Sequence, residues 1–190
     1  MPRYPTIWLL RHGQTEWNAE QRIQGQMESQ LTPLGIEQAQ RQAALMPDIL
    51  AQGPACFASP LGRAQQTARI ALSDTPYITD ARLAEAHAGD WQGLTRIEVR
   101  DRWPDLYHAN PAVLDLFTTA PNGEGFAAFQ ARVADFLSGL RHPSVVVAHG
   151  LLGQVLRGLT MGLTRAEMGG LSNEQGCIYV LKNGQEGVMR

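Results

Sequence analysis

The chain has 190 residues, of which 44% are hydrophobic and 18% charged, a composition typical of a globular protein with a full core. Its formal net charge of -2 lacks the clustered positive charge of proteins that bind nucleic acids or anionic membranes. The two cysteines fit no zinc pattern, and no other metal-ligand spacing is present. We therefore expect a single domain over residues 1–190 with a small-molecule partner.

The N-terminal apolar run covers residues 6–10 and is too short for a signal sequence or a membrane span. We therefore expect a cytoplasmic protein. A short continuous run of large apolar residues predicts a strand that is buried on both faces, as in a parallel sheet. Arg11 and His12 follow directly at the carboxyl end of this strand.

A second strand and two helices are predicted next. Thr32 and Pro33 form a cap-plus-proline signal, and apolar residues keep helical spacing from there to Met46. Residues 55–58 are a short apolar run, and Ser59 with Pro60 repeats the cap signal. The sequence therefore places Arg63 in the first turn of a helix that follows a strand.

The pattern loosens between residues 75 and 121. Residues 77–79 could form a strand, and a short helix is expected from Thr95, where Glu98 completes a capping box. We interpret about residues 84–120 as an insertion that lies over the sheet and forms the mouth of a substrate site.

The last third of the chain shows the clearest periodicity. Apolar residues at helical spacing predict a helix over residues 126–140, and a valine-rich strand follows at residues 144–148. His149 and Gly150 end that strand, and residues 151–161 predict the next helix. Residues 176–181, followed by Asn183-Gly184, predict a terminal hairpin.

This alternation predicts an α/β fold, a three-layer sandwich whose mainly parallel sheet has helices on both faces. Ligands of such folds bind at the carboxyl ends of the strands. That edge should bring together Arg11, His12, Arg63 and His149. Forked guanidinium donors beside an imidazole nucleophile are groups suited to phosphoryl transfer.

The stretches LLRHGQTEWN, SPLGRAQQTA and VVVAHG resemble the first branch of the histidine phosphatase superfamily, also called the phosphoglycerate mutase-like family. The resemblance implies that family's fold and a nucleophilic His12 that becomes phosphorylated. It also implies that Arg11 and Arg63 clamp the phosphate and that His149 completes the pocket as a cationic hydrogen-bond donor. Gly150 and the helix after it could add backbone amides.

The same resemblance extends to the proton donor and the substrate side. The stretch LAEAHAGDWQG resembles the family's acid motif and implies that Glu85 protonates the leaving group and later activates water. Asn18, Gln24 and Gly25 match positions that line the phosphate or substrate side of the pocket. His87 is a further candidate for the substrate mouth.

We predict a metal-independent phosphatase without a cofactor that acts on small phosphomonoesters, with inorganic phosphate as its other ligand. Two alternatives stay open: a cofactor-dependent phosphoglycerate mutase that uses the same His12 and Glu85, and a non-catalytic sensor of a phosphorylated ligand. The sequence does not name the substrate. A homodimer is the commonest oligomer, although no feature of the sequence argues for one.

Overall fold

The structure is a computed structural model that describes residues 4–110 and 112–190. Its centre is a six-stranded sheet in the order β3-β2-β4-β1-β5-β6. Strands β1 to β4 are parallel, whereas β5 pairs antiparallel with both β1 and β6. The strands are β1 (Ile7–Arg11), β2 (Ala55–Ala58), β3 (Ile78–Thr79), β4 (Ser144–Ala148), β5 (Ile178–Lys182) and β6 (Gln185–Met189).

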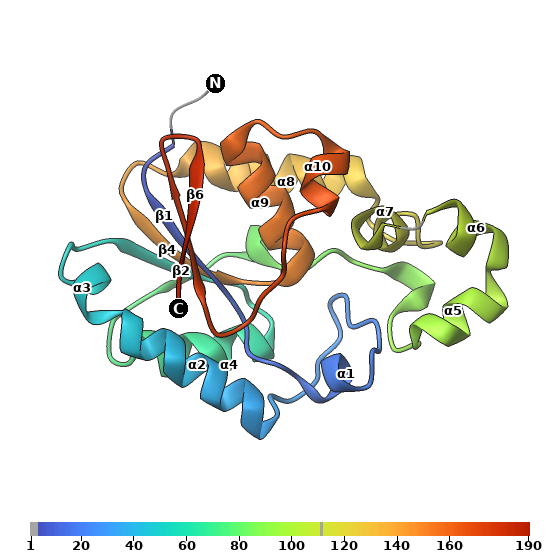
Figure 1. Ribbon diagram of the computed structural model, residues 1–190, viewed down its shortest axis with the longest axis horizontal. Helices are drawn as coiled ribbons and strands as arrows, with labels where there is room; N and C mark the ends of the chain where they lie inside the picture. Colours follow the sequence, from blue (N-terminus) through green and yellow to red (C-terminus); the bar gives the residue numbers. More distant parts are fainter. Residues whose placement is uncertain (1–3, 111) are drawn as a thin grey trace.

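Helices cover both faces of this sheet, which confirms the predicted sandwich (Figure 1). One face packs against α2 (Pro33–Leu45), α3 (Pro47–Leu50) and α4 (Gly62–Leu72), and the other against α8 (Phe126–Gly139) and α9 (Gly150–Met161), with α10 (Arg165–Gly169) beside α9. The side chains of strand β1 alternate between two hydrophobic cores, so helices must cover both faces of the sheet. Trp8 and Leu10 lie in the α2–α4 core, and Ile7 and Leu9 in the α8–α9 core.

The insertion, which we expected over the sheet, lies beside it (Figure 1). Its short helices surround a small core around Trp91 and Leu116, to which Ile23 also contributes. These helices are η2 (Gly89–Trp91), α5 (Arg96–Arg102), α6 (Pro104–Ala109) and α7 (Val113–Thr118). The turn η1 (Ala81–Leu83) precedes the insertion, and α1 (Glu16–Ala19) lies nearer the N-terminus. Among the helices that the structure describes, none is both long and apolar enough to cross a membrane.

One predicted helix start was wrong. Helix α4 begins at Gly62 with Leu61 as its cap, and Ser59 does not cap it. The Ser59 hydroxyl instead accepts a hydrogen bond from the Leu61 amide at 3.3 Å and contacts the ring of His149. Arg63 nevertheless lies in the first turn, as predicted, because the helix starts one residue before it. Helices α3, α6, α7 and α10 were not predicted, since each has only four to six residues.

Two glycines hold helix α2 against the loop that follows β1. A Cβ atom on Gly35 would lie 2.1 Å from the carbonyl oxygen of Gln14, and one on Gly13 would lie 2.1 Å from the carbonyl oxygen of Gly35. The backbones are therefore in direct contact next to His12. Only glycine at both positions permits this approach.

We predict that Gly35→Ala lowers the free energy of unfolding by about 1–3 kcal/mol, because the added methyl group must displace backbone atoms that cannot move independently. Urea denaturation of the wild type and the variant measures this change. Gly139→Ala is the matched control, since a Cβ atom there has no neighbour within 4 Å. The control should retain or slightly increase stability, and equal losses in both variants would contradict the close-contact argument.

Candidate active site

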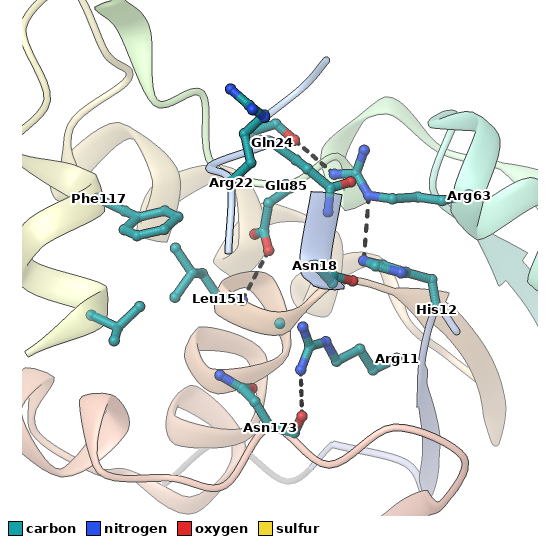
Figure 2. A pocket seen from close by; sticks show the side chains of 13 residues that line it. Arg11, His12, Asn18, Arg22, Gln24, Arg63, Glu85, Phe117, Leu151 and Asn173 are labelled. Carbon is teal, nitrogen blue, oxygen red and sulfur yellow. Dashed lines mark hydrogen bonds between the residues drawn. The ribbon is translucent and has the colours of Figure 1, made fainter. Parts of the chain in front are cut away.

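A cavity of about 150 Å³ lies where β1 and β4 end (Figure 2). Segments from the whole length of the chain meet here, as the parallel strand order requires. The lining residues are Arg11, His12, Asn18, Arg22, Gln24, Gly25, Arg63, Glu85, Val113, Phe117, Gly150, Leu151 and Asn173.

His12 is held as a neutral imidazole with a defined tautomer. Its Nδ1 lies 2.7 Å from the carbonyl oxygen of Gly13, and because a carbonyl can only accept, Nδ1 must have the proton. Nε2 then has a free lone pair, which accepts a hydrogen bond from Nε of Arg63 at 3.3 Å. Burial and the charges of Arg63 and Arg11 lower the pKa of His12 well below its usual 6.5. The ring therefore presents an unprotonated nitrogen to the cavity.

Arg63 is fixed from three directions. Besides the bond to His12, its two terminal nitrogens donate to the carbonyl oxygens of Met27 at 2.8 Å and Gly25 at 2.7 Å. Its side chain is buried, so these carbonyls replace the water that a guanidinium would otherwise bind. Gly25 thus contributes a backbone oxygen that orients Arg63.

Arg11 lies on the other side of His12 and donates to the carbonyl oxygen of Asn173. A Cβ atom on Gly150 would lie 3.4 Å from Nε of Arg11, so the glycine allows the guanidinium to lie against the start of α9. Within the described residues, Nε of Arg11 has no hydrogen-bond partner although it is buried. It remains a donor for an anion in the cavity.

His149 does not line the cavity directly but lies behind it, with its ring centre 5.2 Å from that of His12. Its Nε2 contacts the Ser59 hydroxyl at 2.6 Å. Burial, followed by the charge of Arg63, lowers the pKa of His149 well below 6.5. The ring is therefore neutral in this arrangement, and the predicted cationic donor would require a bound anion that offsets the neighbouring arginines.

Glu85 faces the same cavity from the inserted segment. Its carboxylate oxygens accept the backbone amides of Leu151 at 3.0 Å and Leu152 at 2.9 Å, in the first turn of α9. Arg132 of α8 secures the segment from behind, because it donates to the carbonyl oxygen of Glu85 at 2.9 Å and forms a two-pronged pair with Glu124. Glu85 is thus oriented by a helix terminus and a partly buried arginine together.

Two of the remaining predicted residues, Asn18 and Gln24, line the cavity. Each has a side-chain polar atom that can still form a hydrogen bond. The side-chain oxygen of Asn18 accepts the Thr15 amide at 3.2 Å, which leaves its amide nitrogen to donate. Gln24 donates to the Thr15 hydroxyl at 2.6 Å, and its buried oxygen has no partner in the described part of the chain. His87 does not line the cavity; its Nδ1 accepts the Gly89 amide, and its Nε2 lies 3.3 Å from the Gln92 amide.

This geometry agrees with the comparisons with known proteins. Residues 7–189 match the model of the histidine phosphatase superfamily, branch 1. The chain belongs to this superfamily.

The relatives include both phosphatases and mutases. The chain is 38% identical to a glucosyl-3-phosphoglycerate phosphatase of Mycolicibacterium vanbaalenii, over 85% of the chain and 76% of the relative. It is 33% identical to a 2,3-bisphosphoglycerate-dependent phosphoglycerate mutase of Methylobacterium sp., over 92% and 90% respectively. The crystal structure of the α-ribazole phosphatase from Shigella flexneri superposes with a TM-score of 0.80 at 29% identity, over 97% of this chain and 94% of the other. The family and its named phosphatases identify this histidine phosphatase as a phosphoric monoester hydrolase.

Five cavity residues of this histidine phosphatase were not among the sequence candidates: Arg22, Val113, Phe117, Leu151 and Asn173. Val113 and Phe117 belong to α7, and their spacing of four is the only signal that could have paired them on one helix face. Arg22 lies two residues before the predicted site residue Gln24. Asn173 contributes a backbone carbonyl from a loop, and no side-chain pattern reveals such a contact.

We predict that the free energy of unfolding falls as the pH drops below about 6.5. The unfolded chain then binds protons on His12 and His149, whereas the lowered pKa values keep the folded rings neutral, so acid favours unfolding. Each histidine contributes a slope of up to about 1.4 kcal/mol per pH unit.

Urea denaturation between pH 7.5 and 5.5 measures this slope in the wild type and in the His12→Gln, His149→Gln double variant. The double variant should show a flatter profile. His142→Gln, which removes an exposed histidine, should keep the wild-type slope. Identical slopes in the wild type and the double variant would contradict the assigned role of burial.

Proposed function

We propose that this enzyme hydrolyses small phosphomonoesters without a metal ion, through a phosphohistidine on His12. The observation that supports it most strongly is the state of the His12 ring. A carbonyl binds its Nδ1 proton, so the Nε2 lone pair is available between two fixed guanidinium groups. A neutral imidazole beside cations that bind phosphate is the arrangement that nucleophilic attack on phosphorus requires.

The proposed reaction has two displacements. In the first, Nε2 of His12 attacks phosphorus, the bond from phosphorus to the alcohol oxygen breaks, and Glu85 gives that oxygen a proton. In the second, Glu85 takes a proton from water, the water oxygen attacks phosphorus, and the bond from phosphorus to Nε2 breaks. Inorganic phosphate leaves, and His12 and Glu85 return to their starting states.

The remaining site residues have supporting roles in this proposal. Arg11, Arg63, Asn18 and the Gly150 amide bind the phosphoryl oxygens, while Gln24 and Gly25 shape the phosphate side of the cavity. His149 donates a hydrogen bond to the phosphoryl group after the ring has adjusted to the bound anion. The segment at about 84–120 forms the substrate mouth, to which it contributes Glu85, Val113 and Phe117.

Removal of the nucleophile should abolish turnover. We expect His12→Ala to lose at least about 10³-fold in kcat for p-nitrophenyl phosphate, the scale seen when the group that forms the covalent intermediate is removed. The assay contains excess chelator, and a rapid alkaline quench preserves the label on the wild type, while an acid-treated duplicate shows that the label is acid-labile. His142→Ala, at an exposed site, is the control and should keep full activity.

Chelator-sensitive turnover would contradict metal independence, and turnover that survives in His12→Ala would contradict the nucleophile. A mutase would transfer the label to an added phosphoglycerate in preference to water, so partition of the label between the two acceptors separates the hydrolase from that alternative.

The role of Glu85 predicts a dependence on the leaving group. Glu85→Gln should reduce kcat/KM for ethyl phosphate by roughly 10²–10⁴-fold, the usual contribution of a general acid. The loss should be clearly smaller for p-nitrophenyl phosphate, because its leaving group departs as a stable anion without a proton. Glu37→Gln, at an exposed position of α2, is the control. Equal losses on both substrates would show that Glu85 does not protonate the leaving oxygen.

A further inference from the structure

The cavity has two chemically different sides. Arg63 and Arg11, with the neutral His12 beside them, form the cationic side. Val113, Phe117 and Leu151 form an apolar wall. Figure 2 shows Phe117 and Leu151 on the side of Glu85 that faces away from His12 and Arg63. Glu85 thus marks the boundary between the two sides, and its carboxylate is bound to the Leu151 amide.

This boundary determines where the alcohol half of a substrate lies. The phosphoryl group must contact His12, and the leaving oxygen must contact Glu85, if the proposed reaction is to proceed. The carbon atoms attached to that oxygen then extend past Glu85 toward Phe117, Val113 and Leu151. They meet side chains that offer no hydrogen bond and no charge.

The charged groups near this wall do not favour a second anion. Arg22 is the one lining arginine outside the His12 cluster within the described chain, and it is already paired. Its Nε binds Glu20 at 3.0 Å, a terminal nitrogen donates to the carbonyl oxygen of Gly93, and Glu98 lies 3.9 Å away. Its guanidinium also stacks over the Trp17 ring. Its charge is therefore largely compensated by the protein itself.

The arginines of α5 do not supply the missing cation. None of Arg96, Arg100 and Arg102 lines the cavity. Arg100 pairs with Asp101 at 2.8 Å, and Arg102 lies 3.9 Å from Glu98. A carboxylate on the substrate would instead lie beside Glu85 and the apolar wall, which offer it no cation.

We propose that the preferred substrates have an uncharged, apolar or aromatic group within two or three atoms of the phosphate, and that a carboxylate at this place is disfavoured. This inference rests on the proposed function and names its substrate class. An aromatic group could stack on or pack edge-on against Phe117 while Leu151 and Val113 cover its rim. Phosphomonoesters of hydroxy acids lack this contact and would bury an unpaired carboxylate against apolar side chains.

Three alkyl phosphates with similar primary-alcohol leaving groups test the proposal: ethyl, 2-phenylethyl and 2-carboxyethyl phosphate. We expect kcat/KM to be at least about tenfold higher for 2-phenylethyl than for ethyl phosphate, the scale of a well-filled apolar pocket. The value for 2-carboxyethyl phosphate should be the lowest. A kcat/KM for 2-carboxyethyl phosphate equal to or above that for 2-phenylethyl phosphate would overturn the proposal.

Substitutions in the apolar wall test whether the preference for 2-phenylethyl phosphate depends on Phe117. Phe117→Ala should bring the ratio of kcat/KM for 2-phenylethyl to ethyl phosphate close to one. Phe126→Ala is the matched control, because Phe126 is also a half-buried phenylalanine packed on the α8–α9 core but does not line the cavity. A ratio measured within one variant is insensitive to a loss of folded enzyme.

A gain-of-function variant tests the proposal even if Phe117→Ala fails to fold. Val113→Arg places a cation on the wall and should raise kcat/KM for 2-carboxyethyl relative to ethyl phosphate by about tenfold, the scale of one new ion pair in a partly enclosed site. An unchanged ratio in this variant would show that the wall does not meet the alcohol, and would overturn the proposal.

The two proposals fail in distinguishable ways. If none of the substrates gives turnover that depends on His12, the proposed function is wrong. If turnover depends on His12 but the carboxylated substrate is preferred, the hydrolase stands and only the substrate class is wrong.

Discussion

The site depends on the guanidinium groups of Arg63 and Arg11, which lie beside one imidazole and have no ion-pair partner among the described residues. In the described chain, Arg63 is bound by the carbonyl oxygens of Gly25 and Met27, and Arg11 by that of Asn173. Removing a charge from water costs several kcal/mol, and backbone dipoles offset only part of that cost. A phosphate dianion would complete the compensation. The free protein is thus already arranged for an anion and needs little reorganisation to bind one.

Burial and these charges together determine the state of His12. They disfavour a third cation, so the ring stays neutral, and the Gly13 carbonyl decides which nitrogen retains the proton. The arginines that can bind phosphate thus also help to keep the nucleophile unprotonated. Glu85 is held from two sides, by the first amides of α9 and by Arg132, which pairs with Glu124 behind its segment.

The two sides of the cavity come from different parts of the fold. The phosphate side is built mainly from strand ends and helix starts of the sandwich, and the apolar wall draws Val113 and Phe117 from the inserted segment beside it. The relatives are named for different substrates and for two reactions, those of a phosphatase and a mutase. In the proposed function, the phosphate side carries the reaction and the apolar wall sets the substrate preference.

The sequence by itself determined the strands, the longer helices and the convergence of Arg11, His12 and Arg63. Apolar runs and capping signals are local, and parallel strands must end at one edge of the sheet. Only the tertiary structure showed that His149 is neutral, that His87 lies outside the cavity, and that α7 contributes to the apolar wall of the cavity. These features depend on burial, neighbouring charge and the docking of short helices. None of them leaves a periodic pattern in the chain, because each arises from contacts between residues far apart in sequence.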